Sequence, residues 1–96
     1  MNKELKQPWI DALRSGEFKQ TRGNLKDGVG HCCLGVLCEL SPEKFKESLK
    51  DGFFEEELID FIYWSGMSMA MMDVLAHKND SGKTFDEIAC YIEENL

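Results

Sequence analysis

The feature that most constrains this chain is an uncharged run, CCLGVLC, at residues 32–38. Because no charge interrupts these seven residues, every side of the backbone there must face protein and not water. Residues 31–40 are long enough for a helix of about three turns. We expect this helix at the centre of the core; a strand is the alternative, since periodicity does not settle the conformation of a short apolar run.

Within this run, Leu34 and Leu37 are expected to be fully buried. Gly35 is the unusual residue, because a glycine inside a helix costs about 1 kcal/mol relative to alanine. Its presence predicts the close approach of another backbone, or of a large ring such as that of Trp9 or Trp64.

The remaining elements are also expected to be helical. At 96 residues the chain has room for one hydrophobic core. We predict a mainly α single domain of about five helices around the central one, with α+β as the alternative. A glycine-rich segment at residues 17–30 is expected to be irregular or to form a short β-hairpin. The other predicted elements are a helix at 8–16 beginning at Pro8, one at 42–51 with Ser41 as N-cap and Pro42 at its first position, one at 55–65, a Met-rich helix at 68–78, a turn at 79–82 and a last helix from 84.

The last helix has the clearest local signal. Thr84 and Glu87 have the spacing of a capping box, in which each side chain bonds to the backbone N–H of the other residue. Phe85, Ile88 and Ile92 follow at helical spacing on one face. This face should pack on the core.

Charge is unevenly distributed along the chain. The net charge is −7; residues 1–30 contain six bases and four acids, whereas residues 31–96 contain five bases and fourteen acids. Because DNA binding depends on neutralising phosphates with Lys and Arg, direct DNA binding is not expected. A small anion would be drawn to the N-terminal thirty residues.

Four cysteines and two histidines invite a metal or catalytic interpretation. Cys32 and Cys33 are adjacent and Cys38 lies five residues further on, which is a poor spacing for chelating zinc. No signal peptide or membrane-spanning run is present, so a cytoplasmic location with reduced thiols is expected. We predict no metal and no cofactor; a cysteine-dependent enzyme using Cys32 or Cys33 is the third hypothesis for function.

The candidate site joins the two ends of the chain. Residues 79–84 are predicted to fold back beside the turn that follows the first helix, so that basic and amide side chains meet at the N-terminus of the last helix. The alternative is that Arg14 pairs with Asp11 and Arg22 is merely solvated. The predicted ligand-binding residues are Arg14, Gln20, Arg22, Asn79, Lys83 and Thr84.

Three motifs together resemble a family of short, largely uncharacterised phage and prophage proteins. They are W-x2-ALRSG-x-F-x-Q at residues 9–20, CCLGVLC at 32–38 and ND-x-G-x-TF-x2-IA at 79–89. The resemblance covers both ends of the chain and leaves out residues 41–74. It implies phage origin and, with it, a location in the cytoplasm of the host cell.

Small accessory phage proteins often act on the host by stoichiometric binding, including counter-defence. On this resemblance we expect an accessory protein that binds a host component, with a nucleotide-like anionic signal as the first candidate. The alternative is an acidic protein that blocks a host protein or mimics nucleic acid. No membrane partner is expected, and a homo-oligomer would add stability to so small a core.

Overall fold

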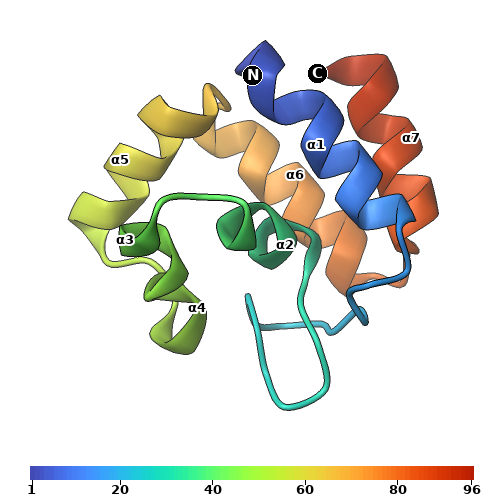
Figure 1. Cartoon of the computed structure of the whole chain (residues 1–96), viewed down its shortest axis with the longest axis horizontal. Coiled ribbons are helices and arrows are strands. Elements are labelled where there is room, and N and C mark those ends of the chain that lie inside the picture. Colours follow the sequence, from blue (N-terminus) through green and yellow to red (C-terminus); the bar gives the residue numbers. More distant parts are fainter.

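The computed structural model describes residues 1–96 and contains helices but no strands, which confirms the mainly α prediction. Figure 1 shows α2 at the centre, with α1, α6 and α7 around it and with α3, α4 and α5 at one end of the molecule. Both termini lie at the same end in that view. The helices are α1 (Lys3–Arg14), α2 (Cys33–Glu39), α3 (Glu43–Lys46), α4 (Ser48–Asp51), α5 (Glu55–Ser65), α6 (Met69–Asp80) and α7 (Phe85–Asn95).

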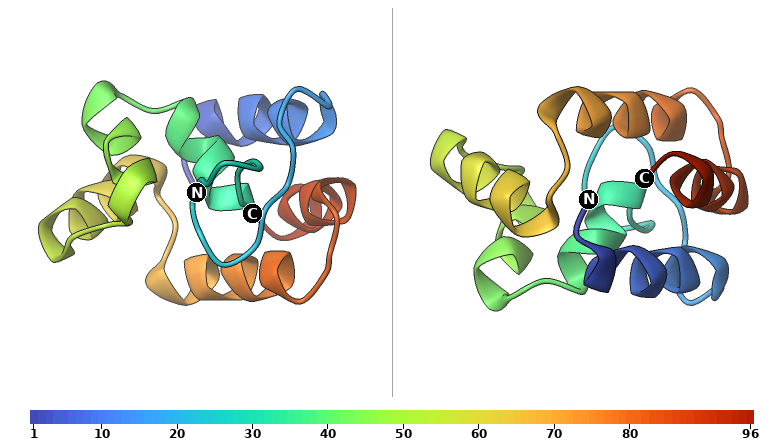
Figure 2. Two further views of the ribbon diagram at one scale, coloured as in Figure 1. Left: turned by 90° about the horizontal axis from the view of Figure 1, so that it is seen from below. Right: turned by 90° about the horizontal axis from the view of Figure 1, so that it is seen from above.

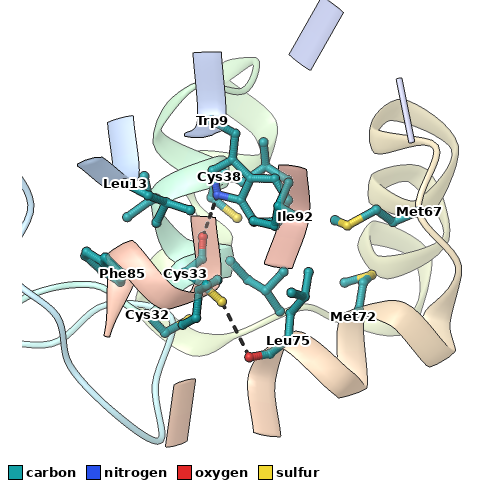
Figure 3. Close-up of a cluster of buried hydrophobic side chains, with 14 of the residues drawn as sticks. Trp9, Leu13, Cys32, Cys33, Cys38, Met67, Met72, Leu75, Phe85 and Ile92 are labelled. Atoms are coloured by element: carbon teal, nitrogen blue, oxygen red, sulfur yellow. Dashed lines mark hydrogen bonds between the residues drawn. The ribbon is translucent and has the colours of Figure 1, made fainter. Parts of the chain in front are cut away.

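The uncharged run forms the buried central helix, so the helical prediction is confirmed and the strand alternative is wrong. The helix α2 is shorter than expected because Cys32 is its N-cap, with its Sγ accepting a hydrogen bond from Gly35 N–H at 3.4 Å. Leu34 and Leu37 are both buried, as predicted. Figure 3 shows how this segment lies among side chains from α1, α6 and α7.

The first helix begins earlier than predicted. It starts at Lys3, where the Asn2 side chain accepts a hydrogen bond from Glu4 N–H at 3.0 Å, so Pro8 lies inside the helix and not at its first position. A cap that satisfies a free amide of the first turn lets the helix form ahead of the proline. On the buried face, Trp9 Nε1 donates to Cys33 O at 2.9 Å, which ties α1 to α2 (Figure 3).

The segment after α2 forms two short helices where one was predicted. Ser41 is not the N-cap, because its Oγ donates back to Cys38 O and so completes the end of α2; the N-cap of α3 is Pro42. The chain turns at Glu47 between α3 and α4. Ser48 is buried there and donates to Glu57 at 2.7 Å.

Residues 15–32 form an irregular loop and not a hairpin. Only isolated bridges occur, from His31 to Gln20 and to Lys26. The loop lies directly on α2, because Leu25 O accepts from Cys32 N–H at 3.1 Å and would stand 1.9 Å from a Cβ placed on Gly35. The predicted close approach at this glycine is therefore confirmed, and it is made by backbone and not by a tryptophan ring.

The helix α5 lies at the outer edge of the molecule in the views of Figures 1 and 2. Its inner face is part of a cluster of aromatic rings around Phe61. The centroid of the Phe61 ring lies 5.4 Å from that of Phe45, 4.7 Å from that of Phe53 and 5.6 Å from that of Trp64. The helix ends at Ser65, as predicted, and its C-cap Gly66 has a left-handed conformation. Rings of this size bury much apolar area, so this cluster is the main attachment of α5.

The Met-rich helix α6 extends further than predicted, to Asp80. Its N-cap is Ser68, and Asn79 is part of the helix and not of a turn. The capping box of α7 at Thr84 and Glu87 is present as predicted. No single helix is long and apolar enough to cross a membrane. Taken together, α5 and α6 have the required length and apolar composition, but the two helices are bent by 96° relative to each other.

Candidate functional site

Asn79 is the centre of the predicted site, and it is fully buried. Its Oδ1 accepts hydrogen bonds from Cys33 N–H at 3.1 Å and from Gln20 Nε2 at 2.9 Å. Its Nδ2 donates to Thr21 O at 2.8 Å. A buried amide with satisfied donor and acceptor atoms specifies geometry strongly. This one fastens the loop to both α2 and α6.

The two ends of the predicted site do lie together. Gln20 Nε2 also donates to Lys83 O at 2.7 Å, and Gly23 N–H donates to Asp80 Oδ1 at 2.9 Å. Residues 79–84 are therefore beside the loop, in the arrangement predicted for them. These contacts engage Gln20 Nε2 and both polar atoms of the Asn79 amide in holding the loop.

The two arginines differ in their surroundings. Arg14 does not pair with Asp11; its guanidinium lies 3.3 Å from Glu93 Oε2 and 3.4 Å from Cys90 Sγ, both on α7. The predicted pairing with Asp11 is wrong because α7 packs alongside α1 and offers a nearer carboxylate, whereas the other part of that alternative, a solvated Arg22, is confirmed. Arg22 is exposed and forms no ion pair.

Lys83, but not Thr84, lines a cavity of about 210 Å³ between the C-terminal end of α6 and the helix α7. Lys83 Nζ is 3.7 Å from Glu87 Oε2, and Thr84 Oγ1 accepts from Glu87 N–H at 3.2 Å. The cavity is lined by Lys78, Lys83, Glu87, Ile88, Cys90, Tyr91 and Glu94. Its two lysines are balanced by two glutamates, so its charge does not select for an anion.

All four cysteines are free thiols. Burial raises the pKa of Cys32 and Cys33 above the ordinary value, and it raises the pKa of Cys38 to about 12. Since the thiolate is the nucleophile, these environments oppose cysteine catalysis. No group of three or more His, Cys, Asp or Glu side chains is arranged to hold a metal. The absence of bound zinc stays a prediction, which elemental analysis of the purified protein would check.

Sequence reasoning missed the outer face of α5. Phe54 is 69% exposed, Ile59 49% and Tyr63 82%. Ile59 and Tyr63 follow one another at i and i+4, and acidic residues such as Glu55 and Asp60 lie on the same exposed arc of the helix. The sequence shows apolar residues on every side of α5, so it could not reveal which ones the fold leaves uncovered.

The region that contains this outer face is strongly acidic. Residues 51–76 contain six carboxylates and neither lysine nor arginine. Lys44, on α3, supplies one nearby positive charge, with its Nζ 3.5 Å from Asp60 Oδ2. Both partners are more than half exposed, so this pair is screened by water and leaves the region negative.

Comparison with known proteins identifies a family but no activity. Residues 1–63 match the family described as "Domain of unknown function (DUF8296)". The matched span includes the loop, α1 to α4 and most of α5, and it ends before α6. No curated protein and no solved structure matches the chain. Because the match covers well over half of its length, the chain belongs to the family described as "Domain of unknown function (DUF8296)".

Proposed function

We propose that this protein acts by stoichiometric binding to a protein partner, through the outer face of α5. The observation that carries the proposal is the exposure of Phe54, Ile59 and Tyr63 within an acidic region. Aromatic side chains are enriched in protein interfaces, because a rigid ring buries a large area at small cost in conformational entropy. Ile59 and Tyr63 lie one turn apart on α5 and Phe54 directly precedes the helix, which supports a binding surface better than scattered single residues would.

The chemistry of this face defines the partner. The acids Glu55, Glu56 and Asp60 border the apolar residues, so the complementary surface is basic and has an apolar pocket for Tyr63. Opposite charges at the border would speed association, and the apolar centre would supply most of the affinity. A protein that binds nucleic acid has such a basic surface. A partner of this kind is consistent with the alternative expectation that the chain mimics nucleic acid.

The resemblance to phage and prophage proteins supports a host protein as the partner. Under this proposal the chain is an accessory protein that blocks its target by occupying a basic surface, and counter-defence is one role of that kind. The phage origin rests on the three sequence motifs alone. The binding face rests on the exposed residues of α5.

A small anionic, nucleotide-like ligand at the predicted residues is the second candidate. The meeting of Gln20, Asn79 and Lys83 supports it. Against it, a ligand that engaged either amide would break bonds that hold the loop, and Arg14 already has a carboxylate partner in Glu93. These contacts favour the protein partner.

The test is co-purification from the native host cells with a matched pair of variants. Tagged wild-type protein is expected to retain one basic protein at a ratio of one to one, measured by native mass spectrometry. The double variant Ile59→Ala/Tyr63→Ala should lose it, because the centre of the interface is gone. Val29→Ser is the control, since Val29 is 68% exposed but lies in the loop and not on α5.

Three results would contradict the proposal. The first is wild-type protein recovered alone; the second is a complex that survives Ile59→Ala/Tyr63→Ala. The third is a dimer of the chain that the double variant disrupts, which would identify the face as a self-interface. Arg14→Ala and Arg22→Ala, assayed by calorimetry against linear and cyclic nucleotides, test the second candidate separately.

A further inference from the structure

A groove on another part of the molecule gathers positive charge. It lies between the loop and the helices α3 and α4, has a volume of about 400 Å³, and is lined by Lys26, Asp27, Glu39, Lys46, Leu49 and Lys50. In Figure 1 the loop and α4 are both on the lower side of the molecule. The volume falls within the usual range for small-molecule sites, roughly 300 to 1,000 Å³.

The lysines of this groove have no partners within the protein. Lys26, Lys46 and Lys50 form no ion pair, although the chain as a whole has an excess of acids. They come from different parts of the chain, one from the loop and two from consecutive short helices. With three lysines against two carboxylates, the lining of the groove has a net positive charge, which a bound anion would offset.

The two acids of the groove are already engaged elsewhere. Asp27 accepts hydrogen bonds from Thr21 Oγ1 at 2.5 Å, and from the N–H groups of Val29 and Gly30 at 2.8 and 3.0 Å. Glu39 Oε2 lies 3.2 Å from His31 Nε2. Neither forms an ion pair with the three lysines, whose ammonium groups remain free to contact a ligand.

We propose that this groove binds a small molecule that carries two adjacent phosphate groups. Three ammonium groups from two sides of a groove suit a ligand with several negative charges, and lysine binds phosphate as a point charge. A single phosphate would reach fewer of the lysines. The groove is separate from the α5 face, and it shares no residue with the six ligand-binding residues predicted from the sequence. The protein would therefore bind this small molecule in addition to its proposed protein partner.

Calorimetry of the full chain with inorganic pyrophosphate tests the site. Pyrophosphate is expected to bind with a Kd below about 1 mM and orthophosphate about tenfold more weakly, since it makes fewer charge-assisted contacts. Lys46→Gln and Lys50→Gln should each weaken pyrophosphate about tenfold. Lys44→Gln is the matched control, because Lys44 lies in the same helix as Lys46 but pairs with Asp60 outside the groove.

The control outcomes separate this site from the alternatives. Lys83→Gln should leave pyrophosphate binding unchanged, as should Ile59→Ala/Tyr63→Ala. The proposal is wrong if pyrophosphate does not bind below about 1 mM at low salt, or if Lys44→Gln weakens it as much as Lys46→Gln does. It is also wrong if an acidic peptide of equal charge binds as tightly, because the groove would then sense charge and not phosphate.

Discussion

The helices α1, α2, α6 and α7 are tied together by hydrogen bonds between distant parts of the chain, whereas α3, α4 and α5 are held mainly by packed rings. In the first group Trp9 bonds to Cys33, and Asn79 bonds to both α2 and the loop. In the second group the attachment depends on Phe45, Phe61 and their aromatic neighbours. Directional bonds fix one geometry, while ring packing tolerates some adjustment.

This difference relates to where the proposed binding sites lie. The α5 face and the lysine groove both involve the second group, which we expect to open locally without unfolding the first. Surfaces that adapt to a partner are drawn from the less stable parts of a protein. Four predictions test the comparison, from the largest expected effect to the smallest.

Leu37→Ala is expected to lower the free energy of unfolding by about 2 to 5 kcal/mol, because it leaves a cavity in the middle of the first group. Urea unfolding measures the loss. Leu40→Ala is the control, since Leu40 is 40% exposed beside the same helix and should cost about 0.5 kcal/mol. A loss below about 1 kcal/mol for Leu37→Ala would mean that α2 is not the organising element.

Asn79→Ala should cost about 1 to 3 kcal/mol, because Cys33 N–H, Gln20 and Thr21 O lose a buried partner together. Urea unfolding again gives the value, and Asn95→Ala, at an exposed site, is the control. If the two variants were equally stable, the amide would not be the attachment of the loop.

The amide protons of α5 are expected to exchange with solvent at least about tenfold faster than those of α7, a difference of about 1.4 kcal/mol in opening free energy. The two helices have eleven residues each, so length does not bias the comparison. Native-state hydrogen exchange by NMR gives both rates. Equal protection would show that the two groups unfold as one unit.

The smallest effect concerns Asp27. Hydrogen bonds from Thr21 and from the N–H groups of Gly30 and Val29 hold the pKa of Asp27 below its ordinary value. A carboxylate with a lowered pKa stabilises the folded state at pH values above its unfolded pKa, and this contribution is lost as the pH falls through the folded pKa. Asp27→Asn should therefore be less stable than wild type at neutral pH, with the difference shrinking as the pH falls below about 3.8 and vanishing once the pH is below the lowered folded pKa. A difference independent of pH would contradict this.

Much of the fold could be predicted from local signals. The uncharged run at 32–38 predicted the central helix, and the Thr84–Glu87 pair predicted the start of α7. Each signal depends on residues a few positions apart. The break between α3 and α4 could not be predicted, because it is accompanied by a contact from Ser48 to Glu57 in the next helix.

The candidate site was only partly predictable, for the same reason. The position of residues 79–84 beside the loop was predicted from the sequence, but Asn79 was interpreted as an ordinary turn residue. Its burial depends on Gln20 and Thr21, nearly sixty positions away. The uncovered face of α5 and the free lysines of the groove also depend on which segments the fold brings near them, and not on their neighbours in sequence.

The attachment of the loop has a consequence for proteases. Residues 15–32 expose basic side chains such as Lys19 and Arg22, which trypsin recognises, in a segment without regular secondary structure. Such segments are normally the first to be cut. A protease must draw its substrate into an extended form, and here it would have to break the bonds of Asn79 and lift Leu25 from Gly35. The most irregular part of this molecule should therefore withstand digestion longer than its secondary structure suggests.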